Sequence, residues 1–107
     1  MDIRIKTTRL DITPAIKKYV EEKISLVFRH LGTIKLMNCD VEIEKVAPGQ
    51  HKGEIFRAEV NLTIPGKLLR VEKTEKDLYK AIDKVKDHLD LVIKKYKEKK
   101  IDKARGK

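Results

Sequence analysis

The chain has 107 residues, and its 26 lysines and arginines outnumber its 17 aspartates and glutamates to give a formal net charge of +9. This length fits one domain with one hydrophobic core rather than two, and a hydrophobic content of 40% is enough to form that core. No apolar run approaches the roughly 18 residues of a membrane-spanning helix. The charge favours a polyanionic partner, with nucleic acid first and an anionic membrane surface second.

The N-terminal part of the chain predicts a strand followed by a helix. Residues 2–7 alternate charged and apolar side chains, which is typical of a half-buried strand. Thr13 and Pro14 then give a helix start signal, a capping hydroxyl followed by a proline at the first helical position. Apolar residues recur at helical spacing over about 18 residues, up to a glycine cap at Gly32. They are Ile16, Tyr19, Val20, Ile24, Val27 and Leu31.

Three further strands are predicted at about residues 37–46, 54–64 and 67–73, where apolar residues alternate with polar ones. A loop containing Pro and Gly at residues 47–53 separates the first two. The tight turn at residues 64–67 (Ile-Pro-Gly-Lys) separates the last two. Because these links are short, the three strands are expected to form an antiparallel meander.

A second amphipathic helix follows and completes the domain. Residues 74–77 (Thr-Glu-Lys-Asp) resemble a capping box with Asp in place of Glu, and helical periodicity then runs to about residue 100. The first strand, the first helix and the second strand form a right-handed crossover, which makes those two strands parallel. The sequence therefore predicts a two-layer α+β domain at residues 1–100, with the order β-α-β-β-β-α. Its four-stranded sheet carries two helices packed on one face, and a flexible basic tail follows at residues 101–107.

Residues that could carry catalysis do not gather in the sequence. His30, His51 and His88 lie far apart, and none has metal-ligand spacing with Cys39, which reads as a buried, inert thiol. A glycine-rich phosphate loop and a nucleophile motif are both missing. We therefore expect no enzymatic activity, no cofactor and no metal. The carboxylates of the second strand are interpreted as a solvated face: Asp40, Glu42 and Glu44.

The excess positive charge is concentrated at the C-terminal end. Residues 91–107 hold eight basic and two acidic side chains, a net of +6, whereas residues 1–90 hold 18 and 15, a net of +3. Such a run can neutralise several phosphates, but it also fits a solubilising, frayed helix end. Lys23, at the edge of the apolar stripe of the first helix, has two similar interpretations: a snorkelling lysine, or a cation positioned to meet a phosphate.

Residues 77–83 (Asp-Leu-Tyr-Lys-Ala-Ile-Asp) resemble the Asp-Met-Tyr-x-Ala-Ile-Asp motif of the bacterial ribosome hibernation-promoting factor family. The same family is known as ribosome-associated inhibitor A or sigma-54 modulation protein. Residues 10–13 (Leu-Asp-Ile-Thr), the helix with Tyr19, Val20 and Lys23, and residues 41–45 (Val-Glu-Ile-Glu-Lys) agree with it too. The resemblance extends from about residue 2 to about residue 100. The length is similar to that of the short form, unless the chain is a truncated long form.

The resemblance implies a cytoplasmic protein that binds the small ribosomal subunit, and hence rRNA, at the decoding region. There it would block mRNA and tRNA binding and inhibit translation under stress or in stationary phase. It implies no membrane, no small-molecule substrate and a monomer when free. Carried over by position, the implied RNA-binding residues are Lys23, Lys80, Lys84, Lys86, Lys94, Lys95, Lys97 and Lys99.

Two departures from the family pattern lie in the second helix. His88 and Leu91 stand where family members often carry Lys or Arg, which weakens the expected mid-helix contact with RNA. The lysine run that begins at Lys94 is available to compensate. A third departure is Lys6-Thr7, where the family often has Thr-Gly.

Two alternatives stay open on the sequence alone. A double-stranded-RNA-binding domain shares the order α-β-β-β-α, although its Gly-Pro-x-His loop and its Lys-Lys-x-x-Lys cluster are missing here. A non-catalytic protein-docking module could instead use the acidic strand face. No aromatic run marks an exposed strand, which argues against the base-stacking platform of an RNA-recognition motif.

Overall fold

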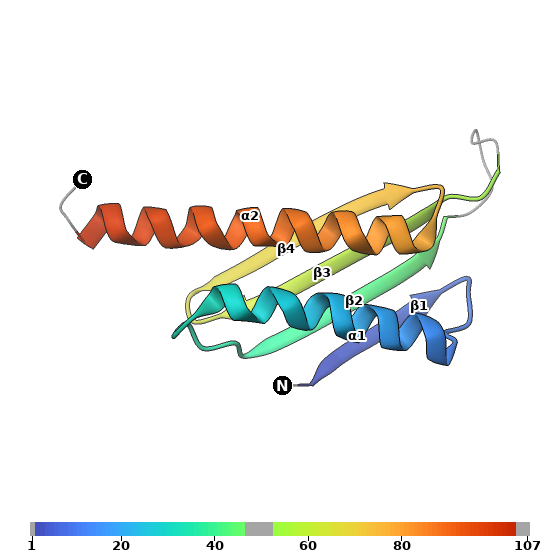
Figure 1. The fold of residues 1–107 in the computed structure, drawn as a ribbon, viewed down its shortest axis with the longest axis horizontal. Coiled ribbons are helices and arrows are strands. Elements are labelled where there is room, and N and C mark those ends of the chain that lie inside the picture. Colours follow the sequence, from blue (N-terminus) through green and yellow to red (C-terminus); the bar gives the residue numbers. More distant parts are fainter. Residues whose placement is uncertain (1, 47–52, 105–107) are drawn as a thin grey trace.

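The computed structural model describes residues 2–46 and 53–104, and it confirms the predicted order of elements (Figure 1). The predicted loop at residues 47–53, including His51, lies outside the described residues except for Gly53, and so do residues 105–107. The elements are β1 (Ile3–Thr8), α1 (Pro14–Phe28), a 3-10 turn η1 (Arg29–Leu31), β2 (Asn38–Lys45), β3 (Phe56–Ile64), β4 (Lys67–Glu75) and α2 (Leu78–Ala104).

The four strands form one sheet in the order β1-β2-β3-β4. As predicted, β1 is parallel to β2, and the remaining neighbours are antiparallel. The register places one apolar row across the sheet, in which Ile5 pairs with Val41, Val41 with Val60, and Val60 with Val71. The alternation of each strand therefore turns its apolar residues to the same face, while β1 and β4 remain as the two edges.

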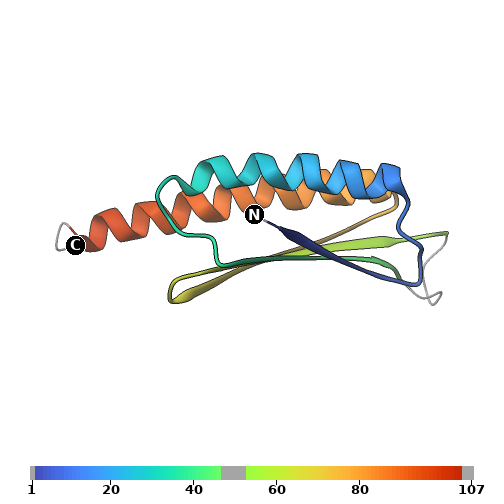
Figure 2. The ribbon, with the colours of Figure 1, turned by 90° about the horizontal axis from the view of Figure 1, so that it is seen from below.

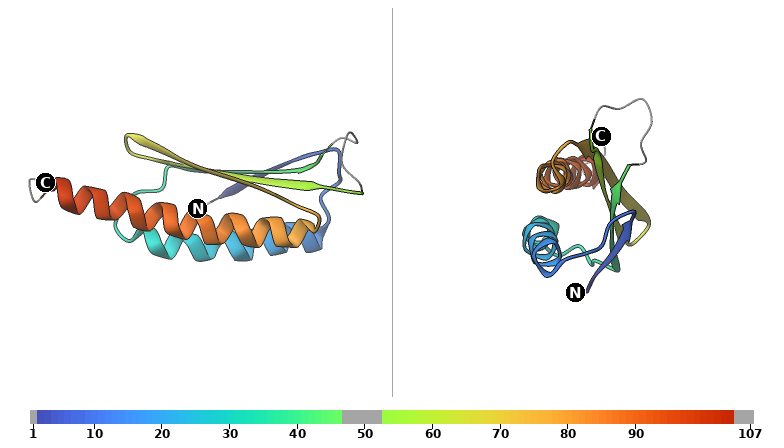
Figure 3. Two further views of the ribbon diagram at one scale, coloured as in Figure 1. Left: turned by 90° about the horizontal axis from the view of Figure 1, so that it is seen from above. Right: turned by 90° about the vertical axis from the view of Figure 1, so that its right-hand side faces the viewer.

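Both helices cover that apolar face, and the other face of the sheet stays open (Figures 2 and 3). Helix α2 packs against β3, β4 and α1. The core between the layers contains only apolar residues and Cys39 among the described side chains. The last turns of α2 extend past the end of the sheet, so the molecule is elongated, with extents of 50 × 29 × 19 Å (Figure 1).

The first helix and the β3–β4 turn follow the sequence predictions closely. The Thr13 hydroxyl accepts a hydrogen bond from the Ile16 amide at 3.1 Å, which confirms the predicted N-cap. The α-helix ends at Phe28, and η1 tightens the last turn before Gly32, whose φ of +60° ends the helical segment. Gly66 has a φ of +75° in the turn between β3 and β4, as the third position of a type II turn requires.

The predicted start signal of the second helix is wrong in its register. Thr74 and Glu75 belong to β4, because Glu75 still pairs with Phe56 across the sheet. Asp77 is the capping residue instead, and its Oδ1 accepts hydrogen bonds from the amides of Tyr79 at 2.8 Å and Lys80 at 3.3 Å. The helix also continues to Ala104, four residues beyond its predicted end.

Replacing Asp77 with alanine should lower the free energy of unfolding by about 1 kcal/mol, because two amides of the first turn lose their acceptor. Urea unfolding followed by circular dichroism measures this loss. Thr74→Ala is the matched control, since Thr74 lies in the strand and should cost less than the cap. An equal or larger loss at Thr74 would contradict this assignment of the cap.

Candidate nucleic-acid interface

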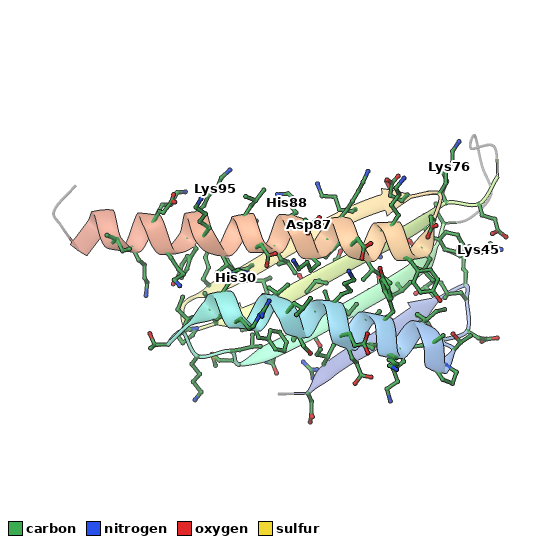
Figure 4. All side chains as sticks on the ribbon, viewed as in Figure 1. His30, Lys45, Lys76, Asp87, His88 and Lys95 are labelled. Atoms are coloured by element: carbon green, nitrogen blue, oxygen red, sulfur yellow. The ribbon has the colours of Figure 1, made fainter. Side chains whose placement is uncertain are left out.

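The eight lysines predicted to bind RNA do not form one patch. At 100° per residue, α2 turns Lys86 and Lys97 towards α1, which carries Lys23. The helix turns Lys84, Lys95 and Lys99 towards β4. Lys80 and Lys94 lie between these flanks on the outer surface, and both are exposed. In Figure 4, His88 and Lys95 leave α2 on the side away from α1, whereas His30 lies between the helices.

Lys23 belongs to a polar cluster that joins α1 to α2. The Tyr19 hydroxyl donates a hydrogen bond to Asp83 Oδ1 at 2.6 Å, and Lys23 Nζ lies 3.4 Å from the same oxygen. Tyr79 packs edge-on against Tyr19 with ring centroids 4.8 Å apart, and Lys23 Nζ lies 5.5 Å from the Tyr19 ring centroid. The hydrogen bond to Asp83, together with burial, raises the pKa of Tyr19 to about 12.

A second cluster joins η1 to the middle of α2. Lys86 Nζ lies 2.9 Å from Asp90 Oδ2, and this contact raises the pKa of the lysine. His30 Nε2 lies 3.5 Å from Asp90 Oδ1, and Lys97 Nζ donates a hydrogen bond to the His30 carbonyl oxygen at 3.1 Å. The three lysines on the α1 side therefore all have partners within the protein.

The flank of α2 that faces β4 differs from the α1 side in how its lysines are paired. Lys84 pairs with Glu75, and this contact lowers the pKa of that glutamate. Lys95 and Lys99 are exposed and line a shallow depression beside the half-buried Tyr96. Neither lysine forms an ion pair with the side chains that the structure describes. This flank consequently presents positive charge that the fold does not neutralise.

Sequence reasoning missed two lysines of β4 that share these depressions. Lys67 lines the same depression as Lys95 and Lys99, and Lys73 lines the neighbouring one with Lys84, His88 and Leu91. Lys67 and Lys73 have the same parity along the strand as the buried Leu69 and Val71, so they lie on its helix-facing side at either end. The shared parity of these four residues is readable from the sequence.

The acidic residues of β2 lie on the open face of the sheet, as the solvated-face interpretation expects, and each is paired with an arginine or lysine. Arg4 lies 2.7 Å from Asp40, and Arg57 contacts Glu42 and lies 3.1 Å from Glu44. Further contacts of Arg57 and Arg70 with Glu59 and Glu72 extend this ladder across the sheet. The face is thus close to neutral, which removes the basis of a docking surface selected by acidic charge.

The described residues contain no group of three or more His, Cys, Asp or Glu placed to hold a metal ion. Cys39 is buried, as predicted, and burial raises the pKa of its thiol to about 12. Within the described part of the chain, no helix combines the length and apolar character needed to cross a bilayer.

Fold and surface together define a two-layer α+β domain with a lysine-rich C-terminal helix that lies along an edge strand. The family described as Sigma 54 modulation protein / S30EA ribosomal protein matches residues 3–101, and the chain belongs to this family. This assignment confirms the family suggested by the motif at residues 77–83. It also sets the chain apart from the double-stranded-RNA-binding domain, whose order has no counterpart of β1.

Curated relatives differ in length. The ribosome hibernation promoting factor of Azotobacter vinelandii is 33% identical over 106 residues, which cover 99% of this chain and 92% of that protein. The corresponding factor of Pseudomonas putida is 30% identical over 99 residues, covering 92% of this chain and 89% of that protein. The ribosome hibernation promotion factor of Deinococcus radiodurans is 32% identical over 88 residues, but these cover 82% of this chain and only 44% of that protein.

Two solved structures share the fold. The N-terminal domain of Thermus thermophilus Protein Y superposes with a TM-score of 0.74 at 34% identity, covering 90% of this chain and 99% of that one. A ribosomal subunit interface protein from Coxiella burnetii gives a TM-score of 0.71 at 21% identity, and the match covers 92% of this chain and 99% of that one. The second likeness shows the fold alone.

Replacing Tyr19 with phenylalanine should lower the free energy of unfolding at pH 8 by about 1 kcal/mol, through loss of the bond to Asp83. Folding raises the pKa of Tyr19 from 10.0 to about 12, so the protonated tyrosine contributes stability that is fully present below pH 10. That contribution disappears as the pH rises towards 12. Urea unfolding from pH 8 upwards should therefore show the wild type and Tyr19→Phe converging, and a pH-independent gap would contradict the role of this hydrogen bond.

Proposed function

We propose that this protein is a ribosome hibernation factor that binds the small ribosomal subunit at the decoding region. It occupies space that mRNA and tRNA need, and it thereby inhibits translation under stress or in stationary phase. It acts in the cytoplasm by occupancy rather than by catalysis, without a cofactor, and is a monomer when free. Family membership carries the proposal, together with the curated relatives named as hibernation factors.

The shape and stiffness of the domain support this mode of action. A protein that blocks a channel must keep its form under contact, and two polar clusters tie α2 to the middle of α1 and to η1. The domain is only 19 Å across its shortest axis and 50 Å along its longest. An elongated body of this kind can enter a channel walled by RNA, where shape and phosphate contacts provide binding with little reading of bases.

The positive charge of α2 supports an rRNA partner. Lys94, Lys95 and Lys99 are exposed near the end of the helix that extends past the sheet. Lysines that neutralise phosphates release counterions, so binding of this kind weakens steeply with salt. Lys84 and Lys97 were also predicted to bind RNA. Within the protein, however, Lys84 contacts Glu75 and Lys97 donates to the His30 carbonyl oxygen. Substitutions of those two would therefore mix stability with binding.

Changing Lys94, Lys95 and Lys99 together to glutamate should weaken binding to isolated small subunits about 100-fold or more at physiological salt, and should relieve inhibition of cell-free translation. Co-sedimentation through a gradient at several salt concentrations measures the binding. Thermal unfolding should stay nearly unchanged, since the three side chains are exposed and pair with no described residue.

The control is a variant with Lys17, Lys18 and Lys35 changed together to glutamate, because it reverses the same number of exposed charges outside α2. The control should retain most of the binding. If both triple variants lost binding equally, the loss would follow from the change in net charge, which would contradict a specific role for α2. Failure of the wild type to bind ribosomal subunits at low salt would refute the proposed function itself.

A further inference from the structure

The two lysines of β4 occupy an unusual place for charged residues, on the side of the strand that faces α2. Leu69 and Val71 fill the middle of that side and are 3% and 4% exposed. Lys67 and Lys73 continue the same side at the two ends of the strand. Because β4 is an edge strand, no other strand of the described sheet lies beyond it, and Lys67 is exposed while Lys73 is partly exposed.

Each of these lysines adjoins lysines of α2. Lys67 lines one depression with Lys95, Lys99 and the ring of Tyr96. Lys73 lines the next depression with Lys84 and His88. The two depressions follow one another along β4 and α2, and we name them together the β4–α2 groove, with Lys67 and Lys73 on its strand wall and Lys84, Lys95 and Lys99 on its helix wall.

The charges of the groove are largely unopposed. Glu75 neutralises Lys84, and Asp87, which also lines the groove, contacts Lys86 at 3.7 Å. Lys67, Lys73, Lys95 and Lys99 form no ion pair with the side chains that the structure describes. The opposite flank of α2 differs, since Asp83 and Asp90 engage Lys23 and Lys86 there. The open face of the sheet is likewise paired.

The two walls of the groove match in length. Lys67 and Lys73 are six residues apart along a strand, about 20 Å. Lys84 and Lys99 are fifteen residues apart along a helix, about 22 Å. Since a strand within a nucleic-acid duplex carries one negative charge per about 3.4 Å of axis, rows of this length can follow several successive phosphates.

The composition of the groove selects the nucleic-acid backbone rather than the bases. Its aromatic residue, Tyr96, is half-buried against the core, and Lys100 Nζ lies 5.5 Å from its ring centroid. A half-buried ring with a lysine beside it offers less surface for a base to stack on than an exposed aromatic residue does. Lysine ammonium groups bind phosphates as point charges and carry little sequence information.

We propose that Lys67 and Lys73 of β4 contact RNA, and that the β4–α2 groove holds one phosphate backbone of the rRNA between its two lysine-bearing walls. This inference rests on the proposed function and deepens it, because it extends the RNA-contacting surface from α2 alone to the adjoining edge strand.

A structural explanation competes with this one, because lysines on edge strands also prevent pairing with the edge of another sheet. Glutamate at the same positions preserves that protection while it repels phosphate. Charge reversal of the two strand lysines therefore separates the two roles, and Lys67→Gln with Lys73→Gln is a milder second variant that removes charge without adding any.

The experiment measures equilibrium binding of the full chain to isolated small ribosomal subunits over a series of salt concentrations. Lys67→Glu with Lys73→Glu should bind at least about 10-fold more weakly than the wild type, and the slope of log K against log salt should become shallower by about two. The glutamine pair should show a smaller change in the same direction. Lys17→Glu with Lys35→Glu, the matched control on other elements, should retain the wild-type slope.

The outcomes distinguish this inference from the proposed function. If the wild type binds small subunits and both strand variants behave like the control, the strand lysines do not contact RNA and α2 binds without them. If the glutamine pair aggregates or loses thermal stability while the glutamate pair stays soluble and binds with the wild-type slope, edge protection is the role of these lysines, and the inference is overturned. A wild type that binds no subunits at low salt refutes the proposed function as well.

Discussion

The carboxylates of Asp83 and Asp90 determine how charge is distributed over this domain. Both lie on the flank of α2 that faces α1, where Asp83 accepts from Tyr19 and Asp90 contacts Lys86 and His30. Half-buried polar pairs of this kind contribute modest stability each, on the order of 1 kcal/mol, but they fix the relative position of the two helices. They also neutralise the basic residues along one side of α2. The excess charge of the helix is consequently directed outward and towards β4.

Most of the fold could be predicted because each element carries a local signal that agrees with its place in the domain. Alternation in the strands, the Thr13-Pro14 start, Gly32 and the Pro65-Gly66 turn all correspond to features of the structure. The predictions failed where a tertiary contact decided the outcome. Pairing between Phe56 and Glu75 extends β4 through the residues that resemble a capping box, and Asp77 then caps the helix. A local pattern cannot report such a partner about 20 residues away.

The candidate site was harder to predict than the fold, for a related reason. Helical periodicity and family resemblance identified lysines along α2, but neither shows which of them meet a carboxylate. Glu75 and the His30 carbonyl oxygen engage Lys84 and Lys97 from other elements, and only the three-dimensional arrangement brings them together. Lys67 and Lys73 were missed because the alternation of β4 was used to find core residues. The ends of an edge strand can present charge on the same side as its core residues.

Strand β4 adds positive charge beside the part of α2 where this chain is expected to depart from the family pattern. The family resemblance leads us to expect basic residues at mid-helix where this chain has His88 and Leu91, and Leu91 is 55% exposed. The depression that contains both residues also contains Lys73, contributed by the neighbouring strand. The edge strand thus adds a cation beside His88 and Leu91, next to Lys84 of the helix. The electrostatic attraction of a phosphate depends on the distance and surroundings of the charge rather than on the element that carries it. A surface can therefore keep its charge while the sequence motif on one helix changes, and alignment of that helix alone would underestimate the positive charge of this interface.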